Sequence, residues 1–367
     1  HDVVLSNPRA EELGLVHNRL IEDRACPEDV FVYIDEHLQK WPPHIFRYPH
    51  HSWLPEDGGE VSRKVAFCNA FRLTSSEVSF RVLLAWLSSP HWRQVRFLGL
   101  SSLRLSPSQW REFGQIDALR SLLSLDVASC TLGGERIHAL CELPFVKELQ
   151  AINVGYTGLG EEELQVLSSV PWTRLEVLRL RANSLGANLL GPLARGEYWS
   201  TLRELDLSNN PVNADGMARL ADAGSLEHVT SLGLRGCNIT SEGLERLVSS
   251  RGFSKLEVLD LSRGAIEDLS KNTHRLARFT RLCELRLHGN RLGANNLEYL
   301  LEDDMIPQIE VLDLSVTELG DDGVALLARC ERFENLRELD LAGNRMGADG
   351  ARALARAPWL ANLERLD

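Results

Sequence analysis

A short phrase that recurs at a fixed interval constrains this chain more than any other feature of its sequence. The clearest copy runs from Leu202 to Asn210 and reads leucine, two variable residues, leucine, one variable residue, leucine, two variable residues and asparagine. Successive copies begin 26 or 27 residues apart, as from Leu149 to Leu175 (26) and from Leu175 to Leu202 (27). The copies begin at Leu122, Leu149, Leu175, Leu202, Val229, Leu256, Leu282, Ile309, Leu336 and Leu363, with weaker ones at Cys68 and Val95. A fixed period of this length is typical of a repeat architecture.

Alternation within the phrase predicts a β-strand. Leu205 and Leu207 are two residues apart, so they point to one side of an extended chain while Asp206 points to the other. One such strand cannot bury its apolar side alone, so stacked copies should form a parallel sheet about 50 Å long at about 4.8 Å per strand. The ninth place needs a compact polar group that satisfies the backbone where the chain turns. It is occupied by Asn183, Asn210, Asn290 and Asn344, and elsewhere by Ser76, Cys130, Thr157, Cys237 and Thr317.

The second half of each repeat predicts a helix. Small and acidic residues open it, as at 213–216 and 320–323, and acidic residues in a first turn suit the helix dipole. A large apolar residue lies nine residues before nearly every phrase and another lies three residues before it, and Trp92, Trp172 and Trp199 occupy the second of these places. We therefore expect these tryptophans to lie in the core.

This phrase, followed by a Gly-x-x-Gly helix start, resembles the leucine-rich repeat family and its ribonuclease-inhibitor-like subfamily. The resemblance implies an α/β solenoid curved like a horseshoe, with a parallel concave sheet and convex helices. It covers residues 65–367, about twelve rungs of which the last is incomplete. Proteins of this family usually grip another macromolecule. The resemblance also leaves an alternative, a GTPase-activating protein, because some ribonuclease-inhibitor-like repeat proteins have that activity.

Residues 1–64 lack the repeat and are expected to cap the first rungs with short, mainly helical segments at 10–24 and 28–40. A metal site at His44, His50 and His51 is the alternative, but no cysteine or second spaced pair supports it. The last phrase begins at Leu363 and stops at Asp367. Either this strand ends the sheet bare or the native chain continues, and we expect a truncation or further domains of a longer native chain.

Composition restricts the class of partner. The chain has 52 acidic and 40 basic residues and a formal net charge of -12, which argues against a nucleic acid or an anionic membrane. The sequence has no run of eighteen apolar residues, so it predicts no membrane span. Three of the seven cysteines, Cys130, Cys237 and Cys283, fall inside strand phrases, which predicts reduced thiols and a cytoplasmic location. No Gly-x-Ser-x-Gly, His-Glu-x-x-His, phosphate-binding loop or Cys-x-x-Cys occurs, so we expect no catalytic residue, cofactor or metal.

The candidate site is the concave face, where the residues between the inward leucines should meet a partner protein. This face has charges of both signs. One interpretation is a ladder of ion pairs between neighbouring strands, with Arg235 between Asp206 and Asp260, each pair contributing little in water. The other is a polar groove that binds a charged protein segment. The candidate residues are Tyr156, Arg179, Arg181, Asp206, Arg235, Asp260, Arg286, His288, Asp313 and Asp340.

The rung that starts at Leu256 departs from the pattern. Gly264 replaces the asparagine, Thr273 replaces a buried leucine, and the expected helical part from Leu269 to Phe279 is basic. Two interpretations remain open, namely drift in a tolerant rung and a locally distorted rung with a function.

Overall fold

The computed structural model describes residues 54, 56, 59–62, 65, 68, 70–73, 78–92, 95–195, 199–221, 226–250, 252–270 and 275–367. Within these residues, twelve short parallel strands form one sheet in strict chain order. The strands are β1 (Ala70–Arg72), β2 (Phe97–Gly99), β3 (Ser124–Asp126), β4 (Ala151–Asn153), β5 (Val177–Arg179), β6 (Glu204–Asp206), β7 (Ser231–Gly233), β8 (Val258–Asp260), β9 (Glu284–Arg286), β10 (Val311–Asp313), β11 (Glu338–Asp340) and β12 (Arg365–Leu366). Each strand pairs with the next in the register set by the repeat, so that Leu178 lies opposite Leu205 and Leu205 opposite Leu232.

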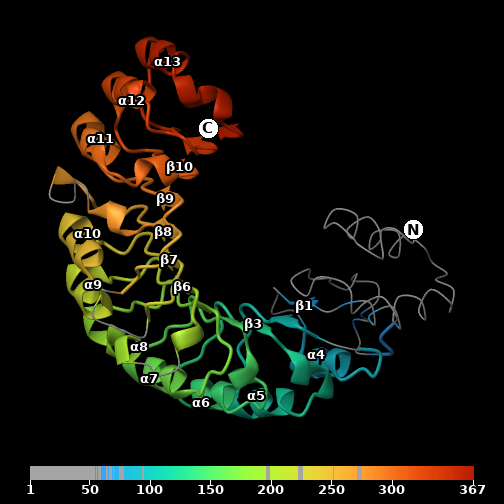
Figure 1. Cartoon of the computed structure of the whole chain (residues 1–367). Coiled ribbons are helices and arrows are strands. Elements are labelled where there is room, and N and C mark those ends of the chain that lie inside the picture. Colours follow the sequence, from blue (N-terminus) through green and yellow to red (C-terminus); the bar gives the residue numbers. More distant parts are fainter. Residues whose placement is uncertain are drawn as a thin grey trace.

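Helical segments back the strands. The α-helices are α4 (Phe80–Leu87), α5 (Pro107–Phe113), α6 (Glu135–Cys141), α7 (Glu161–Ser169), α8 (Gly191–Arg195), α9 (Asn213–Ala221), α10 (Thr240–Ser249), α11 (Gly293–Glu302), α12 (Gly320–Arg329) and α13 (Ala348–Leu354). Shorter 3-10 helices are η4 (Asp117–Ser121), η5 (Val146–Glu148), η6 (Ala187–Leu190), η7 (Trp199–Thr201), η10 (Leu276–Arg278), η11 (Ile306–Gln308) and η12 (Pro358–Asn362). The strands line the inside of a curved arc and the helices its outside (Figure 1). The predicted horseshoe solenoid is confirmed, whereas the capping segment predicted over residues 1–64 lies almost entirely outside the described residues.

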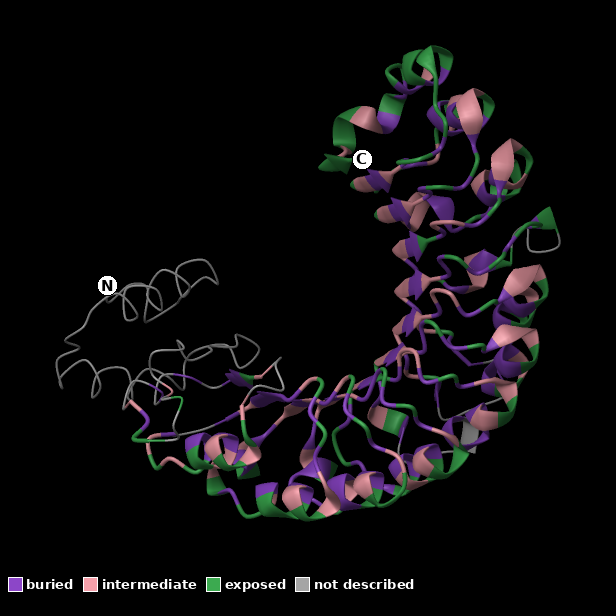
Figure 2. Ribbon diagram, turned by 180° about the vertical axis from the view of Figure 1, so that it is seen from behind, coloured by how far each residue is buried: buried purple, intermediate pink, exposed green. Residues whose placement is uncertain are grey.

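The core is the continuous layer between sheet and helices, where buried residues follow the whole arc (Figure 2). Leu205, Leu207 and Trp199 are fully buried, and Trp92 and Trp172 are nearly so, as predicted. The indole of Trp172 donates to the carbonyl of Leu167 at 3.1 Å, which satisfies its polar edge inside the core.

The asparagines form a ladder that joins consecutive rungs. The amide oxygen of Asn210 accepts from the backbone N–H groups of Asn183 at 2.8 Å and Leu185 at 3.0 Å, in the previous rung. Its amide nitrogen donates to the carbonyls of Leu180 at 3.0 Å and Leu207 at 2.7 Å. The buried turn therefore has its backbone groups satisfied by one side chain, as the ninth place of the phrase predicted.

The rung of β8 differs from its neighbours. Residues 265–269 are not helical, and in the described part of the stretch where a helix was expected, from Leu269 to Phe279, Ser270 and η10 are 3-10 and no residue is α-helical. That prediction is wrong for these residues. Asn296 of α11 takes over: it accepts from the N–H of Leu269 and donates to the carbonyl of Glu267, both at 2.8 Å. The neighbouring rung thus supplies the hydrogen bonds that a helix would have made.

Candidate functional site

Each strand presents three side chains to the concave face, at the third, fifth and seventh places of its phrase. We call these sets the first row, the middle row and the rim row; in the rung of β6 they are Glu204, Asp206 and Ser208. In β6 the central Leu205 is buried and its two neighbours are partly exposed, as the alternation requires. The sequence analysis used the middle and rim rows. It missed the first row, which the same alternation, extended back by one step, would have found.

The aspartates of the middle row have a structural role. Oδ1 of Asp206 accepts from the backbone N–H of Ser208 at 2.9 Å, two residues further along. The same bond joins Asp126 to Ala128 at 3.0 Å, Asp260 to Ser262 at 2.9 Å, Asp313 to Ser315 at 2.9 Å and Asp340 to Ala342 at 2.9 Å. An aspartate that caps its own backbone in this way ends a strand in a turn. The second carboxylate oxygen of these aspartates has no hydrogen bond to any described residue, so each aspartate still presents a charge to the groove.

The arginines of the middle row pair with the first row, not with the aspartates. Arg179 Nε on β5 lies 2.7 Å from Glu204 Oε1 on the neighbouring strand β6. Arg286 pairs with Glu284 of its own strand. Arg235 forms no ion pair in the described part of the chain, so the predicted pairing with Asp206 and Asp260 is wrong. A ladder of neighbouring-strand ion pairs therefore does not neutralise this face.

The rim row contains a linked set of polar side chains. Nδ1 of His288 lies 2.8 Å from Ser315 Oγ, and Ser315 Oγ donates to Asp313 Oδ1 at 2.5 Å. A carboxylate can only accept, so the serine proton is committed to Asp313 and the serine oxygen accepts from Nδ1–H of His288. The imidazole therefore cannot act as a base towards this hydroxyl. Arg181 bonds the side-chain oxygen of Asn209, one rung on, through Nε at 3.0 Å and Nη2 at 3.1 Å in the amide orientation that satisfies both groups.

Two large apolar side chains stand exposed where the chain leaves the rim. Tyr156 is 53% exposed and Val316 48% exposed. Both occupy the eighth place of the phrase, which we call the turn place, and both have a positive φ, 58° and 54°. Tyr156 was among the predicted site residues. Val316 was missed, although a β-branched residue where other rungs have Gly, Ser or Asn is a signal visible in the sequence.

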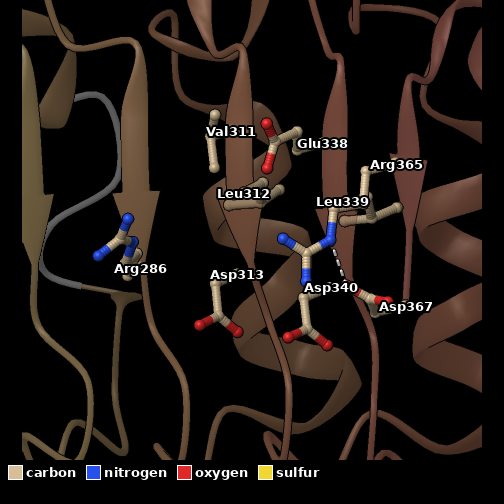
Figure 3. Close-up of a pocket in the computed structure, with 9 residues that line it drawn as sticks. All are labelled: Arg286, Val311, Leu312, Asp313, Glu338, Leu339, Asp340, Arg365 and Asp367. Carbon is tan, nitrogen blue, oxygen red and sulfur yellow. Dashed lines mark hydrogen bonds and ion pairs between the residues drawn. The ribbon is translucent and has the colours of Figure 1, made fainter. Parts of the chain in front are cut away.

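A shallow hollow of about 130 Å³ lies at the C-terminal end of the concave face (Figure 3). Asp313 and Asp340 lie directly opposite each other on β10 and β11. Arg365 donates to Asp367 at 2.6 Å, so this arginine does not neutralise Asp313 or Asp340. The lining residues are Arg286, Val311, Leu312, Asp313, Glu338, Leu339, Asp340, Arg365 and Asp367.

Two other kinds of site were sought in the same part of the chain. No described group of three or more His, Cys, Asp or Glu residues is placed to hold a metal ion. Among the described residues, no helix has the length and apolar character that crossing a membrane would require.

Comparisons with known proteins found one family model, a human relative and a solved structure that are similar to this chain. A model of the leucine-rich repeat family matches residues 200–221, 225–248 and 334–355. The human protein "NACHT, LRR and PYD domains-containing protein 12" is 31% identical over 206 residues, which cover 53% of this chain. The match spans only 19% of that relative's length. A crystal structure of an internalin from Listeria monocytogenes aligns with 84% of this chain and 89% of its own, at 16% identity and a TM-score of 0.42.

The repeated phrase, the single parallel sheet in chain order, the asparagine ladder and the matched repeats lead to one conclusion. The chain is a leucine-rich repeat protein.

Proposed function

We propose that this chain is a non-enzymatic protein-recognition module that binds a partner protein along its concave face. The observation that supports this most is the set of middle-row carboxylates. Asp206, Asp260, Asp313 and Asp340 each use one oxygen to end a strand and leave the other without a partner among the described residues. A serine or asparagine could cap the same turn, so the charge itself is not needed for folding. Charges spaced at the strand interval of about 4.8 Å suit an extended or helical protein segment.

The candidate residues fall into two groups, those held in an ion pair and those without one among the described residues. Arg179 and Arg286 are already held by Glu204 and Glu284, so they are weaker candidates for direct contact. Arg235, Asp206, Asp260, Asp340 and Tyr156 have no side-chain partner in the described residues, and the only such partner of Asp313 is the hydroxyl of Ser315. We propose that these make the direct contacts, with Tyr156 as an amphipathic anchor of the kind that is enriched at binding hot spots.

A photo-crosslinking experiment tests the proposed face. A benzophenone amino acid replaces Ser231, in the first row of β7, and in a second protein replaces Arg329, which is exposed at the end of α12 on the convex side. Both proteins are irradiated in a lysate of the source organism, and crosslinked products are identified by mass spectrometry. We expect a discrete protein adduct from position 231 that is absent from position 329. Equal labelling at both positions, or adducts from position 329 alone, would contradict the concave-face proposal.

The cellular compartment of the protein is also a proposal. Burial raises the pKa of the Cys130 thiol to about 11 and that of Cys237 to about 12, so neither forms a thiolate readily. Both cysteines occupy the ninth place of the phrase, and their thiols donate to backbone carbonyls. Cys130 donates to Leu100 at 2.9 Å and Cys237 to Leu207 at 3.1 Å. Thiols used in this way need to stay reduced, which supports a cytoplasmic location. Fractionation of source cells, with detection by antibody, tests it.

A further inference from the structure

The charges of the concave face differ between its rows, each of which runs along the length of the sheet. Between the rungs of β4 and β10, the first and middle rows hold Glu204, Asp206, Asp260, Glu284 and Asp313, and their two arginines are paired with glutamates. The rim row and turn place of the same rungs contain no acidic residue. These two places hold Gly155, Tyr156, Arg181, Ala182, Ser208, Asn209, Arg235, Gly236, Ser262, Arg263, His288, Gly289, Ser315 and Val316. We call this stretch the rim strip.

The cations of the rim strip are available to a ligand. Arg235 and Arg263 form no ion pair or side-chain hydrogen bond with any described residue, and Arg181 contacts only the neutral amide of Asn209. Arg181 lies two rungs before Arg235, and Arg263 lies in the rung after Arg235, so the three guanidinium groups follow one edge of the solenoid. In a chain of net charge -12, an edge that has cations and no carboxylate is unusual in composition.

The rim strip also contains a buried polar group without a partner. Ser262 is fully buried, and its Oγ has no hydrogen bond. It lies in the rim row between Arg235 and His288, whereas the equivalent hydroxyl of Ser315 donates to Asp313. A buried donor left in this state is unfavourable unless an acceptor reaches it.

Strained apolar residues stand at both ends of the rim strip. Val316 is β-branched and has a φ of 54°, a conformation that such residues rarely adopt. Its exposed side chain lies against Gly343, where an added Cβ would be 2.9 Å from Val316 Cγ2. Neither burial nor backbone preference favours valine here, and strain of this kind points to a function. Tyr156 stands in the equivalent place six rungs earlier, about 29 Å away at about 4.8 Å per strand.

We propose that the rim strip binds an extended acidic segment of the partner protein, with one apolar side chain against Tyr156 and another against Val316. An extended chain advances about 3.3 Å per residue, so about nine residues of the segment reach between the two anchors. Carboxylates of the segment meet Arg181, Arg235 and Arg263. The aspartates of the middle row repel these carboxylates, so the acidic segment stays on the rim strip while the aspartates remain open to basic side chains elsewhere in the partner. This inference rests on the proposed function and names the chemistry of the partner.

The test measures binding of a fluorescein-labelled peptide by fluorescence anisotropy. The peptide has about nine residues, with leucine at each end and three glutamates between glycines, to match the anchor spacing. A second peptide has lysines in place of the glutamates. We expect the acidic peptide to bind at least about tenfold more tightly than the basic one, and to bind more weakly at higher salt.

Three variants make the test specific. Charge reversal at Arg181, Arg235 and Arg263 should weaken the acidic peptide at least about tenfold, because three unpaired cations are lost. The matched control reverses Arg219, Arg329 and Arg356, which are exposed on the helical side and have no ion pair to a described residue; binding should change less than about twofold. Val316→Gly should weaken binding while the midpoint of thermal unfolding does not fall, since glycine accepts the positive φ. A merely structural role for Val316 would lower both.

Several results would overturn the rim strip. The basic peptide could bind more tightly than the acidic one, or the helical-side control could lose as much affinity as the rim variant. A polyuridylate oligonucleotide could bind more tightly and displace the peptide, or the acidic peptide could fail to bind at about 1 mM. In any of these cases, a surviving crosslink at position 231 leaves the proposed concave-face function standing. Loss of that crosslink in the wild-type chain would remove the proposed function as well.

Discussion

At the scale of single residues, the ninth place of the phrase determines more of the fold than any leucine. The amide of Asn210 makes two donor and two acceptor bonds inside the core, and three of the four reach the previous rung, while the fourth reaches Leu207 of its own rung. The leucines around it contribute apolar area, which many side chains could supply. The asparagine supplies a pattern of donors and acceptors that only a carboxamide has in full.

Replacement of this amide gives the first prediction. Asn210→Ala leaves the buried N–H groups of Asn183 and Leu185 without an acceptor and opens a cavity, so the free energy of unfolding should fall by about 2–4 kcal/mol. Urea denaturation followed by circular dichroism measures it. The matched control is Asn188→Ala in η6, an exposed asparagine, where the change should stay within about 0.5 kcal/mol. Similar losses in both variants would contradict the role assigned to Asn210.

At the scale of elements, side chains of one rung complete the ends of the next. Glu163 of α7 accepts from the N–H of Gly160 at 3.0 Å, just before its own helix, and from that of Gly134 at 2.9 Å, just before α6. Asp321 of α12 accepts from Gly347 at 2.6 Å and Gly350 at 2.9 Å at the start of α13. Asn296 does the same for the irregular rung of β8. Helices too short to be stable alone are thereby tied to their neighbours.

Glu163 gives a prediction for pH. The backbone N–H of Gly134 is the largest cause that lowers the pKa of this carboxyl below its ordinary value of 4.5. A lowered pKa in the folded state means that the stabilisation is complete above the unfolded value and is lost as pH falls through the folded value. Glu163→Gln should therefore lower the midpoint of thermal unfolding at pH 7, and the difference should vanish at acid pH. A difference that persists below pH about 3 would contradict this account.

The elements also show what could be predicted from the sequence. The strands and their register followed from a period of two inside a period of 26 or 27, because both are properties of neighbouring residues. The missing helix near Leu269 could not be predicted, because its replacement bonds come from Asn296 in another rung. Ion-pair partners were equally hidden: Arg179 has both Asp206 and Glu204 within one strand of it, and only side-chain geometry selects Glu204.

At the scale of the whole molecule, every rung contacts chiefly the rung before and the rung after it. The strand order follows the chain without a crossover, so no contact ties the two ends of the described sheet together. Stability then depends on the sum of rung energies and neighbour interfaces, in the manner of a one-dimensional array. A weak interface in the middle can separate the array into parts that unfold independently.

Leu205→Ala tests this. Leu205 is fully buried in β6, between two rungs whose leucines lie in register with it, so the cavity should cost about 2–5 kcal/mol. We expect urea unfolding to broaden or split into two transitions, followed by tryptophan fluorescence and circular dichroism. Leu339→Ala in β11 serves as the control, because only one described strand lies beyond it. A single transition of unchanged slope in Leu205→Ala would contradict independent unfolding of the two parts.

The turn place has a consequence for how such a chain can change by duplication. From the rung of β6 onward, this place alternates between a side chain and glycine: Asn209, Gly236, Arg263, Gly289, Val316 and Gly343. Asn209, Arg263 and Val316 each lie over the glycine of the following rung. A Cβ added at that glycine would be 2.5 Å from the side chain of Asn209, 3.0 Å from that of Arg263 and 2.9 Å from that of Val316. Within these rungs, deletion of a rung that has glycine would bring two side chains together at this edge, whereas deletion of two consecutive rungs preserves the alternation. Over these six rungs the repeating unit of the edge is therefore a pair of repeats, although the fold is built from single ones.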